Sequence, residues 1–331
     1  MVNREWNPAE LLELSGYYWK TCVLHAGVKL DVFTIIGNEP LTAEQISRKL
    51  NGAQRGVQRL LNALVAMALL SKTDEKYANT PSSLDFLSKT STKYIGHIIM
   101  HHHHLMESWS NLDQAVQSGQ PIRIRSSFSN EEWRESFLLG MFNMAMNLAP
   151  QLVPKIDLST RHHLLDLGGG PGTYAIHFCL NNPQLNATVF DLPTTKPFAE
   201  KTIVKFGLTD RIRFREGNYL EDEVKGNYDA AWLSHILHGE GPEACQKIIQ
   251  KATAVLEPGG VIIVHDFILN NTMDGPLFPA LFSLNMLLGT SAGQSYSEKQ
   301  IFDMLTGAGV KDIRRIPVQM PNDSGIIAGI A

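Results

Sequence analysis

Acidic residues and glycines at regular spacing form the part of the sequence that most clearly suggests a chemical function. Asp166 lies within the apolar run Leu164–Leu167, a pattern typical of a buried strand. Glycines then follow at alternate positions: Gly168, Gly170 and Gly172. Glycine allows a tight turn with positive φ and lets a ligand approach the backbone closely. Asp191 closes the next apolar run, where a carboxylate can accept hydrogen bonds from ribose hydroxyls, so the segment predicts a nucleotide-binding β-α-β unit.

The spacing of these residues distinguishes between nucleotides. A dinucleotide-binding loop requires G-x-G-x-x-G/A, and Thr173 stands where the third small residue would be. A carboxylate at Asp166 would repel a pyrophosphate, but it suits the ammonium group of an amino acid. A ligand with an adenosine end and a cationic amino-acid end is S-adenosylmethionine (SAM), which we therefore expect as the cofactor. NAD and a purely structural glycine turn remain as alternatives.

Length and composition set the outer limits. A chain of 331 residues can form two domains or one large one, and 44% hydrophobic residues are typical of a globular protein. The net charge of -4 implies no bulk attraction to nucleic acid. Cys22, Cys179 and Cys245 show no metal or disulfide spacing and are expected to be buried thiols. No apolar run has the length of a membrane span and no signal peptide is recognisable, so a cytoplasmic protein without a membrane partner is expected.

The N-terminal region has helical patterning followed by a hairpin. Helices are expected over three ranges: 9–26, 41–51 and 54–70. Thr42, with Gln45 three residues later, forms a capping-box signature, and 71–80 has the pattern of a short β-hairpin. This order is similar to a winged helix-turn-helix, which can bind DNA, but the second helix offers only Arg55 and Arg59 beside an apolar remainder. A helix face of this kind is expected to be buried in a partner subunit.

Strands and helices alternate in the second half of the chain. Further helices are expected over 93–150, and strands are expected at 162–167, 187–191, 211–215, 228–233, 260–266, 311–318 and 325–330. This alternation predicts an α/β fold, a doubly wound sheet with its ligand at the carboxyl ends of the strands. Four polar residues fall at or just after such ends and should line one edge of the sheet: Asp166, Asp191, Asn218 and His238.

Several motifs carry a family resemblance: DLGGGPGTYA, VFDLP, GNYL, ILHGEGPE and LEPGGVIIVHDFIL. They resemble those of the SAM-dependent O-methyltransferases of plant and bacterial secondary metabolism, a group that includes hydroxyindole, caffeate and antibiotic-tailoring enzymes. The resemblance covers nearly the whole chain. It implies a class I methyltransferase, Rossmann-like doubly wound sheet over 154–331 and an N-terminal, mainly α winged-helix dimerisation domain over 1–105. It also implies a helical connector over 106–153 that lines the acceptor pocket, and an intertwined homodimer.

The resemblance implies a catalytic base and a residue that orients it. The histidine of the family's ILHDW motif corresponds to His238, and the acid near the end of the next strand corresponds to Asp266. A hydroxyl group is a poor nucleophile until its proton is removed, and a neutral imidazole suits that task near pH 7. Asp266 would fix the tautomer of the histidine and stabilise the imidazolium. His235, three residues before the base, is expected to belong to the loop at the strand end.

The sequence also departs from the family pattern. Gly239–Glu240 replaces the Asp-Trp that follows the histidine, Ser234 replaces a lysine, and a second glutamate of the plant enzymes falls near Ser295. Asn218 replaces an acid that meets adenine, and its amide oxygen can still accept a hydrogen bond from the adenine amino group. These differences favour the bacterial members and leave the acceptor open. The expected cofactor-binding residues are Asp166, Gly168, Gly170, Gly172, Asp191, Leu192, Asn218, Tyr219 and Ser234.

A run of histidines lies in the segment before the connector. His97, His101 and His104 share one helical face, and three histidines on one face can hold zinc. No cysteine or acidic residue joins them at a suitable offset, so a polar wall of the acceptor pocket or a partly exposed helix is expected, and no metal. The resemblance places the acceptor pocket among His101, His104, Trp109, Phe142, Met146, Phe282, Asn285 and Met286.

These observations together predict a homodimeric enzyme that transfers a methyl group from SAM to a hydroxyl of a small molecule. One alternative is a methyltransferase of the same fold with a sulfur or carbon acceptor, which would not require a base. Another is a SAM-dependent enzyme of this fold that no longer transfers a methyl group. A third, from a different class, is a winged-helix DNA-binding regulator that senses SAM. Glu298 and Gln300 follow Ser295 and Ser297 as capping boxes and are assigned no chemistry.

Overall fold

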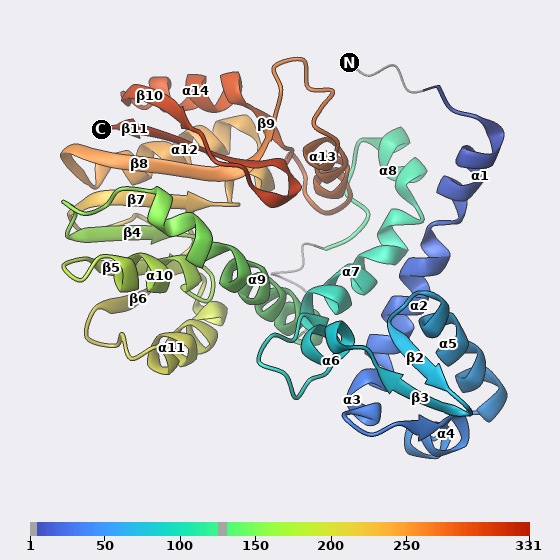
Figure 1. The fold of residues 1–331 in the computed structure, drawn as a ribbon. Coiled ribbons are helices and arrows are strands. Elements are labelled where there is room, and N and C mark those ends of the chain that lie inside the picture. Colours follow the sequence, from blue (N-terminus) through green and yellow to red (C-terminus); the bar gives the residue numbers. More distant parts are fainter. Residues whose placement is uncertain (1–4, 125–130) are drawn as a thin grey trace. The chain divides into compact units, whose positions relative to one another are not determined.

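The structure is a computed structural model that describes residues 5–124 and 131–331. The chain divides into two compact units, Met1–Leu105 and Met106–Ala331. Each unit has a sheet and a hydrophobic core of its own (Figure 1). Among the described residues, no helix combines the length and the apolar character needed to cross a membrane.

The first unit combines helices with a small antiparallel sheet. Its helices are α1 (Pro8–Gly16), α2 (Tyr18–Lys29), α3 (Val32–Ile36), α4 (Ala43–Leu50), α5 (Gln54–Ala66) and α6 (Pro81–Leu87), and α7 (Gly96–Trp109) begins in it. Its strands β1 (Leu41–Thr42), β2 (Leu70–Thr73) and β3 (Lys76–Asn79) pair in the order β1-β3-β2. The predicted capping box at the start of α4 is confirmed, because Thr42 Oγ1 accepts from the Gln45 N–H at 3.2 Å and Gln45 Oε1 accepts from the Thr42 N–H at 2.8 Å.

Two details of the first unit differ from the sequence predictions. The helix predicted over 54–70 ends at Ala66, because Ala68 adopts a left-handed φ of 57° and Leu70 enters β2. The expectation of a buried thiol is wrong for Cys22, which is exposed, whereas Cys179 and Cys245 are buried as expected. The reason is that α2 buries only residues near its C-terminal end, and α1 buries none.

The second unit is built on a mainly parallel sheet. Its strands are β4 (His163–Leu167), β5 (Asn186–Asp191), β6 (Ile212–Glu216), β7 (Tyr228–Ser234), β8 (Leu256–Leu269), β10 (Lys311–Ile316) and β11 (Ser324–Ile330). They lie in the order β10-β11-β8-β7-β4-β5-β6, and β9 (Tyr296–Ser297) pairs with β8. Strands β4 to β8 are parallel to one another, while β11 runs antiparallel to both β8 and β10. The predicted doubly wound sheet is confirmed.

Helices cover both faces of this sheet (Figure 1). The helices of this unit are α8 (Leu112–Ser118), α9 (Glu131–Leu152), α10 (Thr173–Asn181), α11 (Lys196–Lys205), α12 (Pro242–Ala254), α13 (Leu277–Gly289) and α14 (Glu298–Gly307), with short 3-10 turns at Val153–Lys155, Pro193–Thr195, Leu237–Gly239 and Pro321–Asp323. Helix α8 packs against α13. Side chains alternate along β4, so Leu164 packs in the core that includes α10, while Leu165 packs in the core that includes α12.

The order of the strands determines where a ligand can bind. Strand β4 lies between β5 and β7, and the chain moves outward through β5 and β6 before it returns to β7 on the other side of β4. A crevice opens at the carboxyl ends of the strands at such a reversal, because the connections leave β4 and β7 toward opposite faces. The carboxyl ends of β4, β5, β7 and β8 carry Asp166, Asp191, Ser234 and Asp266 respectively.

Candidate active site

The loop between β4 and α10 has the backbone that its glycines make possible. Gly168, Gly170 and Gly172 have φ of 68°, 54° and 75°, in the region that favours glycine. A Cβ at Gly168 would lie 2.5 Å from Ile236 Cγ2, and one at Gly169 would lie 2.6 Å from the carboxyl carbon of Asp166. The turn is therefore packed closely against the connection that follows β7 on one side and against the Asp166 carboxylate on the other.

Asp166 is a buried carboxylate with an unusual environment. Its residue exposure is 1%, and Oδ2 accepts a hydrogen bond from the Ala175 N–H at 3.2 Å. Oδ1 is buried and has no hydrogen-bond partner among the described residues. Burial raises the pKa of Asp166 to about 7, with a smaller contribution in the same direction from Asp191. A carboxylate oxygen without a partner at this edge of the sheet fits the ammonium group of SAM.

Asp191 links the end of β5 to the glycine loop. Its Oδ2 accepts from the Gly170 N–H at 2.8 Å, and its Oδ1 accepts from the Leu192 N–H at 2.7 Å and from Thr195 Oγ1 at 3.1 Å. The structure thus brings together the two acids and the glycines that the sequence analysis identified.

The remaining residues of the expected cofactor set lie at neighbouring loops. Asn218 follows β6, and its Oδ1 accepts from the Leu220 N–H at 3.0 Å, so one lone pair of this amide oxygen is already used. The hydroxyl of Tyr219 donates to Glu240 Oε1 at 3.4 Å. Ser234, the last residue of β7, pairs through Oγ with His265 Nδ1 at 2.9 Å.

His238 and Asp266 form a close polar pair in this region. His238 lies in the 3-10 turn after β7 and Asp266 lies in β8, and His238 Nδ1 is 2.6 Å from Asp266 Oδ1. The side chains are 12% and 4% exposed, so the pair is largely shielded from water. The carboxylate also accepts from the His238 N–H at 3.3 Å and from the Phe267 N–H at 2.8 Å. Burial raises the pKa of Asp266, but the imidazoles of His238 and His235 outweigh it and bring this pKa below its usual range.

His235, His238 and Asp266 also contain the ligand atoms that metals prefer. One such atom from each residue lies within 4.8 Å of the others, and this is the one group of its kind in the described part of the chain. However, the 2.6 Å contact between His238 and Asp266 has the length of a short charge-assisted hydrogen bond. That distance accommodates a proton between the two atoms, whereas a zinc ion needs about 2.0 Å to each ligand.

Aromatic rings surround the imidazole of His238. The Phe267 ring stacks on it with centroids 5.8 Å apart, and the Phe282 ring meets it edge-on at 4.8 Å. Phe278 continues this wall through contacts with Phe267 at 4.9 Å and with Phe282 at 6.0 Å. An apolar wall beside a basic nitrogen suits an aromatic or otherwise apolar substrate that presents one polar group to the histidine.

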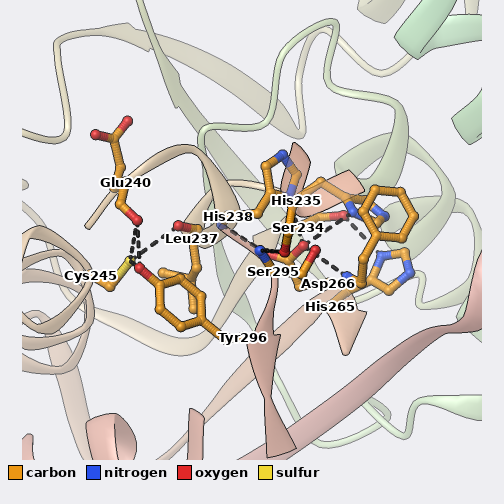
Figure 2. A network of polar contacts seen from close by, with 12 residues as sticks. Ser234, His235, Leu237, His238, Glu240, Cys245, His265, Asp266, Ser295 and Tyr296 are labelled. Carbon is orange, nitrogen blue, oxygen red and sulfur yellow. Dashed lines mark hydrogen bonds and ion pairs between the residues drawn. The ribbon is translucent and has the colours of Figure 1, made fainter. Parts of the chain in front are cut away.

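Hydrogen bonds from buried side chains hold the turn that carries His238 (Figure 2). The hydroxyl of Tyr296 donates to the Glu240 carbonyl at 2.5 Å, and the thiol of Cys245 donates to the Leu237 carbonyl at 3.1 Å. Tyr296 and Cys245 are 2% and 0% exposed. The carbonyls on both sides of His238 are therefore fixed by side chains from β9 and α12.

The roles of Tyr296 and Cys245 were not predicted from the sequence. Cys245 was expected to be buried, which is correct, but not to hold the turn, and Tyr296 carried no signal beyond its place beside Ser295. The Ser297–Gln300 capping box is confirmed, since Ser297 Oγ accepts from the Gln300 N–H at 3.2 Å. The capping box predicted for Ser295 and Glu298 is wrong, because α14 begins at Glu298 with Ser297 as its cap. Ser295 is fully buried, and its N–H donates to Ser283 Oγ at 2.9 Å.

The expected acceptor residues of the second unit fall into two groups. Phe282 contacts His238, and Asn285 lies one helical turn further along α13, where its Oδ1 accepts from Trp109 Nε1 at 3.3 Å. Met286 is buried beside Asn285. In contrast, Met146 on α9 lies against His177 of α10, with Sδ 3.5 Å from Nε2. Within residues 131–331, no ring contact or hydrogen bond joins Met146 or Phe142 to His238.

His101 and His104 belong to the first unit, on α7. His101 is 9% exposed, and the His103 and His104 rings lie 5.8 Å apart. His103 Nε2 is 3.1 Å from Lys29 Nζ, and its ring meets that of His25 edge-on at 5.5 Å. In the described residues of this unit, no three histidine, cysteine or acidic side chains come close enough to share a metal ion.

Comparisons with known proteins agree with this architecture. The O-methyltransferase domain family matches residues 109–311, and the O-methyltransferase dimerisation domain family matches residues 12–89. The chain is 30% identical over 329 residues to the 3-hydroxy-5-methyl-1-naphthoate 3-O-methyltransferase of Streptomyces sahachiroi, covering 98% of this chain and 95% of that protein. It is 27% identical over 321 residues to an N,N-dimethyltransferase of Streptomyces rimosus, covering 92% of each.

A solved structure shows the same fold. Human N-acetylserotonin methyltransferase, in complex with SAM, matches with a TM-score of 0.88 at 24% identity, and the match covers 100% of this chain and 99% of that one. Fold and site together define a SAM-dependent methyltransferase of small molecules. The chain belongs to the O-methyltransferase family with an N-terminal dimerisation domain. The predictions of the family, the fold and the cofactor are therefore confirmed.

Proposed function

We propose that this enzyme transfers the methyl group of SAM to a hydroxyl of a small apolar molecule, with His238 as general base and Asp266 as the residue that orients it. The observation that carries the proposal is the 2.6 Å contact between His238 Nδ1 and Asp266 Oδ1. A proton held on Nδ1 by the carboxylate leaves Nε2 with its lone pair. Nε2 can then accept the hydroxyl proton as the oxygen attacks, while Asp266 stabilises the imidazolium that forms.

The cofactor would bind along the carboxyl ends of β4, β5 and β7. Asp166 would pair with the ammonium group of SAM, and Asp191 would accept from the ribose hydroxyls. The glycine loop with Leu192, Asn218, Tyr219 and Ser234 would complete this site. When bound, SAM supplies an electrophilic methyl on a sulfonium, which is a good leaving group. The chain itself contributes orientation and exclusion of water, because the turn of His238 is fixed on both sides and its ring is shielded by phenylalanines.

The acceptor would lie against the aromatic wall of Phe267 and Phe282, within reach of His238. Trp109, Asn285 and Met286 on α7 and α13 support this location, since Asn285 lies one turn from Phe282 and bonds to Trp109. His101 and His104, and Phe142 and Met146 of the connector 106–153, remain proposed lining residues. The Streptomyces relative acts on a hydroxynaphthoate, which makes hydroxylated naphthoates the first acceptors to test.

The test is replacement of His238 by alanine, followed by release of S-adenosylhomocysteine with a hydroxynaphthoate. Loss of a positioned general base typically lowers the rate by about 10²–10⁴-fold, so kcat should fall by at least about 100-fold while SAM affinity stays the same. The control is His162→Ala, which removes an exposed histidine at the start of β4. Turnover that survives in His238→Ala would show that no base is needed.

A second candidate function is transfer to a nitrogen acceptor. The specific observation in its favour is the N,N-dimethyltransferase among the relatives, at 27% identity. A neutral amine carries its own lone pair and needs no base before it attacks the methyl group. Comparison of naphthols with matched naphthylamines on the wild type and on His238→Ala separates the two functions, because only the hydroxyl acceptor should depend on His238.

We also propose that the enzyme is a homodimer formed through the first unit. The dimerisation domain family matches residues 12–89, and α1 buries no residue within its own chain. Large apolar side chains are exposed there: Trp6, Leu11, Leu12, Leu14, Tyr17, Tyr18 and Trp19. An apolar surface of this density is typical of a region covered by a second subunit. The proposed domain limits are 1–105 for dimerisation, 106–153 for the connector and 154–331 for SAM binding.

A further inference from the structure

His235, one residue beyond the end of β7, has a strained backbone. Its φ is 56°, a left-handed conformation that is unfavourable for a residue other than glycine. The His235 N–H donates to the His265 carbonyl at 2.8 Å, and its ring lies 4.3 Å from the His265 ring and 4.5 Å from the Phe267 ring. Such a backbone persists only where the surroundings enforce it, and strain of this kind concentrates at functional sites.

The conformation turns the imidazole of His235 toward the carboxylate of Asp266. Nδ1 of His235 is buried, has no hydrogen-bond partner among the described residues, and lies 3.6 Å from Asp266 Oδ1. The same oxygen lies 2.6 Å from His238 Nδ1. One carboxylate oxygen thus faces two imidazoles from the same strand connection (Figure 2).

We propose that His235 is a positioning residue that shares the Asp266 carboxylate with His238 and thereby limits how strongly this carboxylate holds the proton on His238. The inference rests on the proposed role of His238 as the base. An imidazole N–H directed at the carboxylate partly neutralises its negative charge. Asp266 then orients His238 but stabilises its imidazolium less than an unshared carboxylate would.

The other titratable groups around Asp266, His235 and His238 are uncharged. His265 of β8 is fully buried, and burial keeps its pKa well below its usual value. Burial also raises the pKa values of Cys245 on α12, Tyr296 on β9 and Tyr174 on α10, so all three stay protonated. Asp266 and the two histidines that face it are therefore the groups whose charges respond to one another.

The experiment is a pH titration of the His238 ring by NMR in the complex with S-adenosylhomocysteine, with the signal assigned by its loss in His238→Ala. In His235→Phe, which keeps an aromatic ring against His265 and Phe267, the titration midpoint of His238 should rise by about one pH unit. His235→Gly removes the same N–H and tolerates the left-handed backbone, so it should give the same shift if the Phe variant does not fold. His235→Asn retains a donor and suits this backbone, so it should reverse part of the shift.

A matched control is present in the same domain. His162 Nδ1 lies 3.6 Å from Asp229 Oδ2, the same separation as His235 from Asp266, but at the start of β4. His162→Asn should leave the His238 titration unchanged. In activity assays His235→Phe should lose several-fold in kcat at pH 6.5 and recover at pH 9, which a merely structural defect would not do. An unchanged midpoint in both His235→Phe and His235→Gly would overturn the inference, whereas full activity of His238→Ala would overturn the proposed function instead.

Discussion

Asp166 and Asp266 are buried carboxylates of the second unit, 1% and 3% exposed respectively, yet their pKa values move in opposite directions. Burial disfavours the charged form of both Asp166 and Asp266. Asp266 has two imidazoles beside it, so its charge is stabilised and its pKa is low. Asp166 has one backbone N–H and another acid, Asp191, nearby, so its pKa rises to about 7. The difference suits their proposed roles, because Asp266 has its cationic partner within the chain and Asp166 would obtain one from SAM.

The environment of Asp166 predicts a pH-dependent affinity for SAM. The ammonium group pairs with the carboxylate but not with the neutral acid, so the Kd for SAM should increase as pH falls through about 7. Asp166→Asn should weaken SAM binding at pH 8 by at least about tenfold and abolish this pH dependence. Isothermal titration calorimetry between pH 6 and 8.5 measures both effects. Asp229→Asn is the control, because that carboxylate accepts from the His162 and His163 N–H groups at the other end of the strand.

The same substitution should stabilise the protein without SAM. A carboxyl whose folded pKa is about 7, above the 3.8 of an unperturbed aspartate, binds a proton in the folded state that the unfolded chain has lost. The stability from this group is therefore complete below about pH 4 and is lost as pH rises through about 7. At pH 8 the free energy of unfolding of Asp166→Asn should exceed that of the wild type by roughly 1–3 kcal/mol. Equal or lower stability in denaturant titrations would contradict the assignment of Asp166 as an uncompensated buried charge.

Tyr296 should affect catalysis through the turn that it holds. Tyr296→Phe removes the hydrogen bond to the Glu240 carbonyl and frees one side of the His238 turn. We expect kcat to fall by about tenfold, because small displacements of a catalytic group reduce the rate strongly, while the Kd for SAM changes little. Tyr228→Phe is a matched control, since it removes a hydrogen bond from a buried tyrosine to the Lys225 carbonyl elsewhere in the domain. Equal kcat in the two variants would show that the turn does not need Tyr296.

At the scale of elements, α2 and α7 contain a cluster of histidines that are easier to protonate after unfolding. Burial lowers the pKa of His25 to about 4, with contributions from His103 and His102, and His103 lies beside Lys29. Below about pH 6.5 the unfolded chain gains a proton at His25 that the folded protein does not bind. Stability from this group is therefore present above that pH and is lost as pH falls toward about 4.

The pH dependence of unfolding checks this cluster. The Tm of the wild type should fall by several degrees between pH 7.5 and 5, and His25→Phe should reduce that fall because it removes the buried group that takes up the proton. The control is His162→Phe, which removes an exposed histidine of the other unit. A pH dependence of Tm that is the same in the wild type and His25→Phe would place the acid sensitivity elsewhere.

Local sequence signals predicted most elements but not their ends. The capping boxes at Thr42 and Ser297 are complete within four residues, so the sequence alone identifies them. The end of α5 at Ala66 depends on Leu70 being drawn into β2, and the exposure of Cys22 depends on which face of α2 the core covers. Neither follows from helical periodicity, because both depend on packing between segments.

The site divides in the same way between what could be predicted and what could not. His238 follows the end of β7 and Asp266 lies near the end of the adjacent parallel strand β8, so their meeting could be predicted from strand order and motif. The role of Tyr296 could not, because it acts on a backbone carbonyl 56 residues away, which carries no side-chain signature. The left-handed backbone of His235 was equally hidden, since histidine has no strong preference for that conformation.

At the scale of the whole molecule, the proposed dimer makes a prediction about mass and surface. Light scattering should give about twice the chain mass of 36.8 kDa. Leu12 and Trp19 are 74% and 67% exposed, and replacing both by serine should shift the mass toward the monomer, because the interface would lose large apolar side chains. Leu180→Ser with Val204→Ser removes apolar side chains that are 51% and 62% exposed in the second unit, and this control should keep the dimer mass. A monomeric wild type, or dissociation caused equally by both pairs, would contradict dimerisation through α1 and α2.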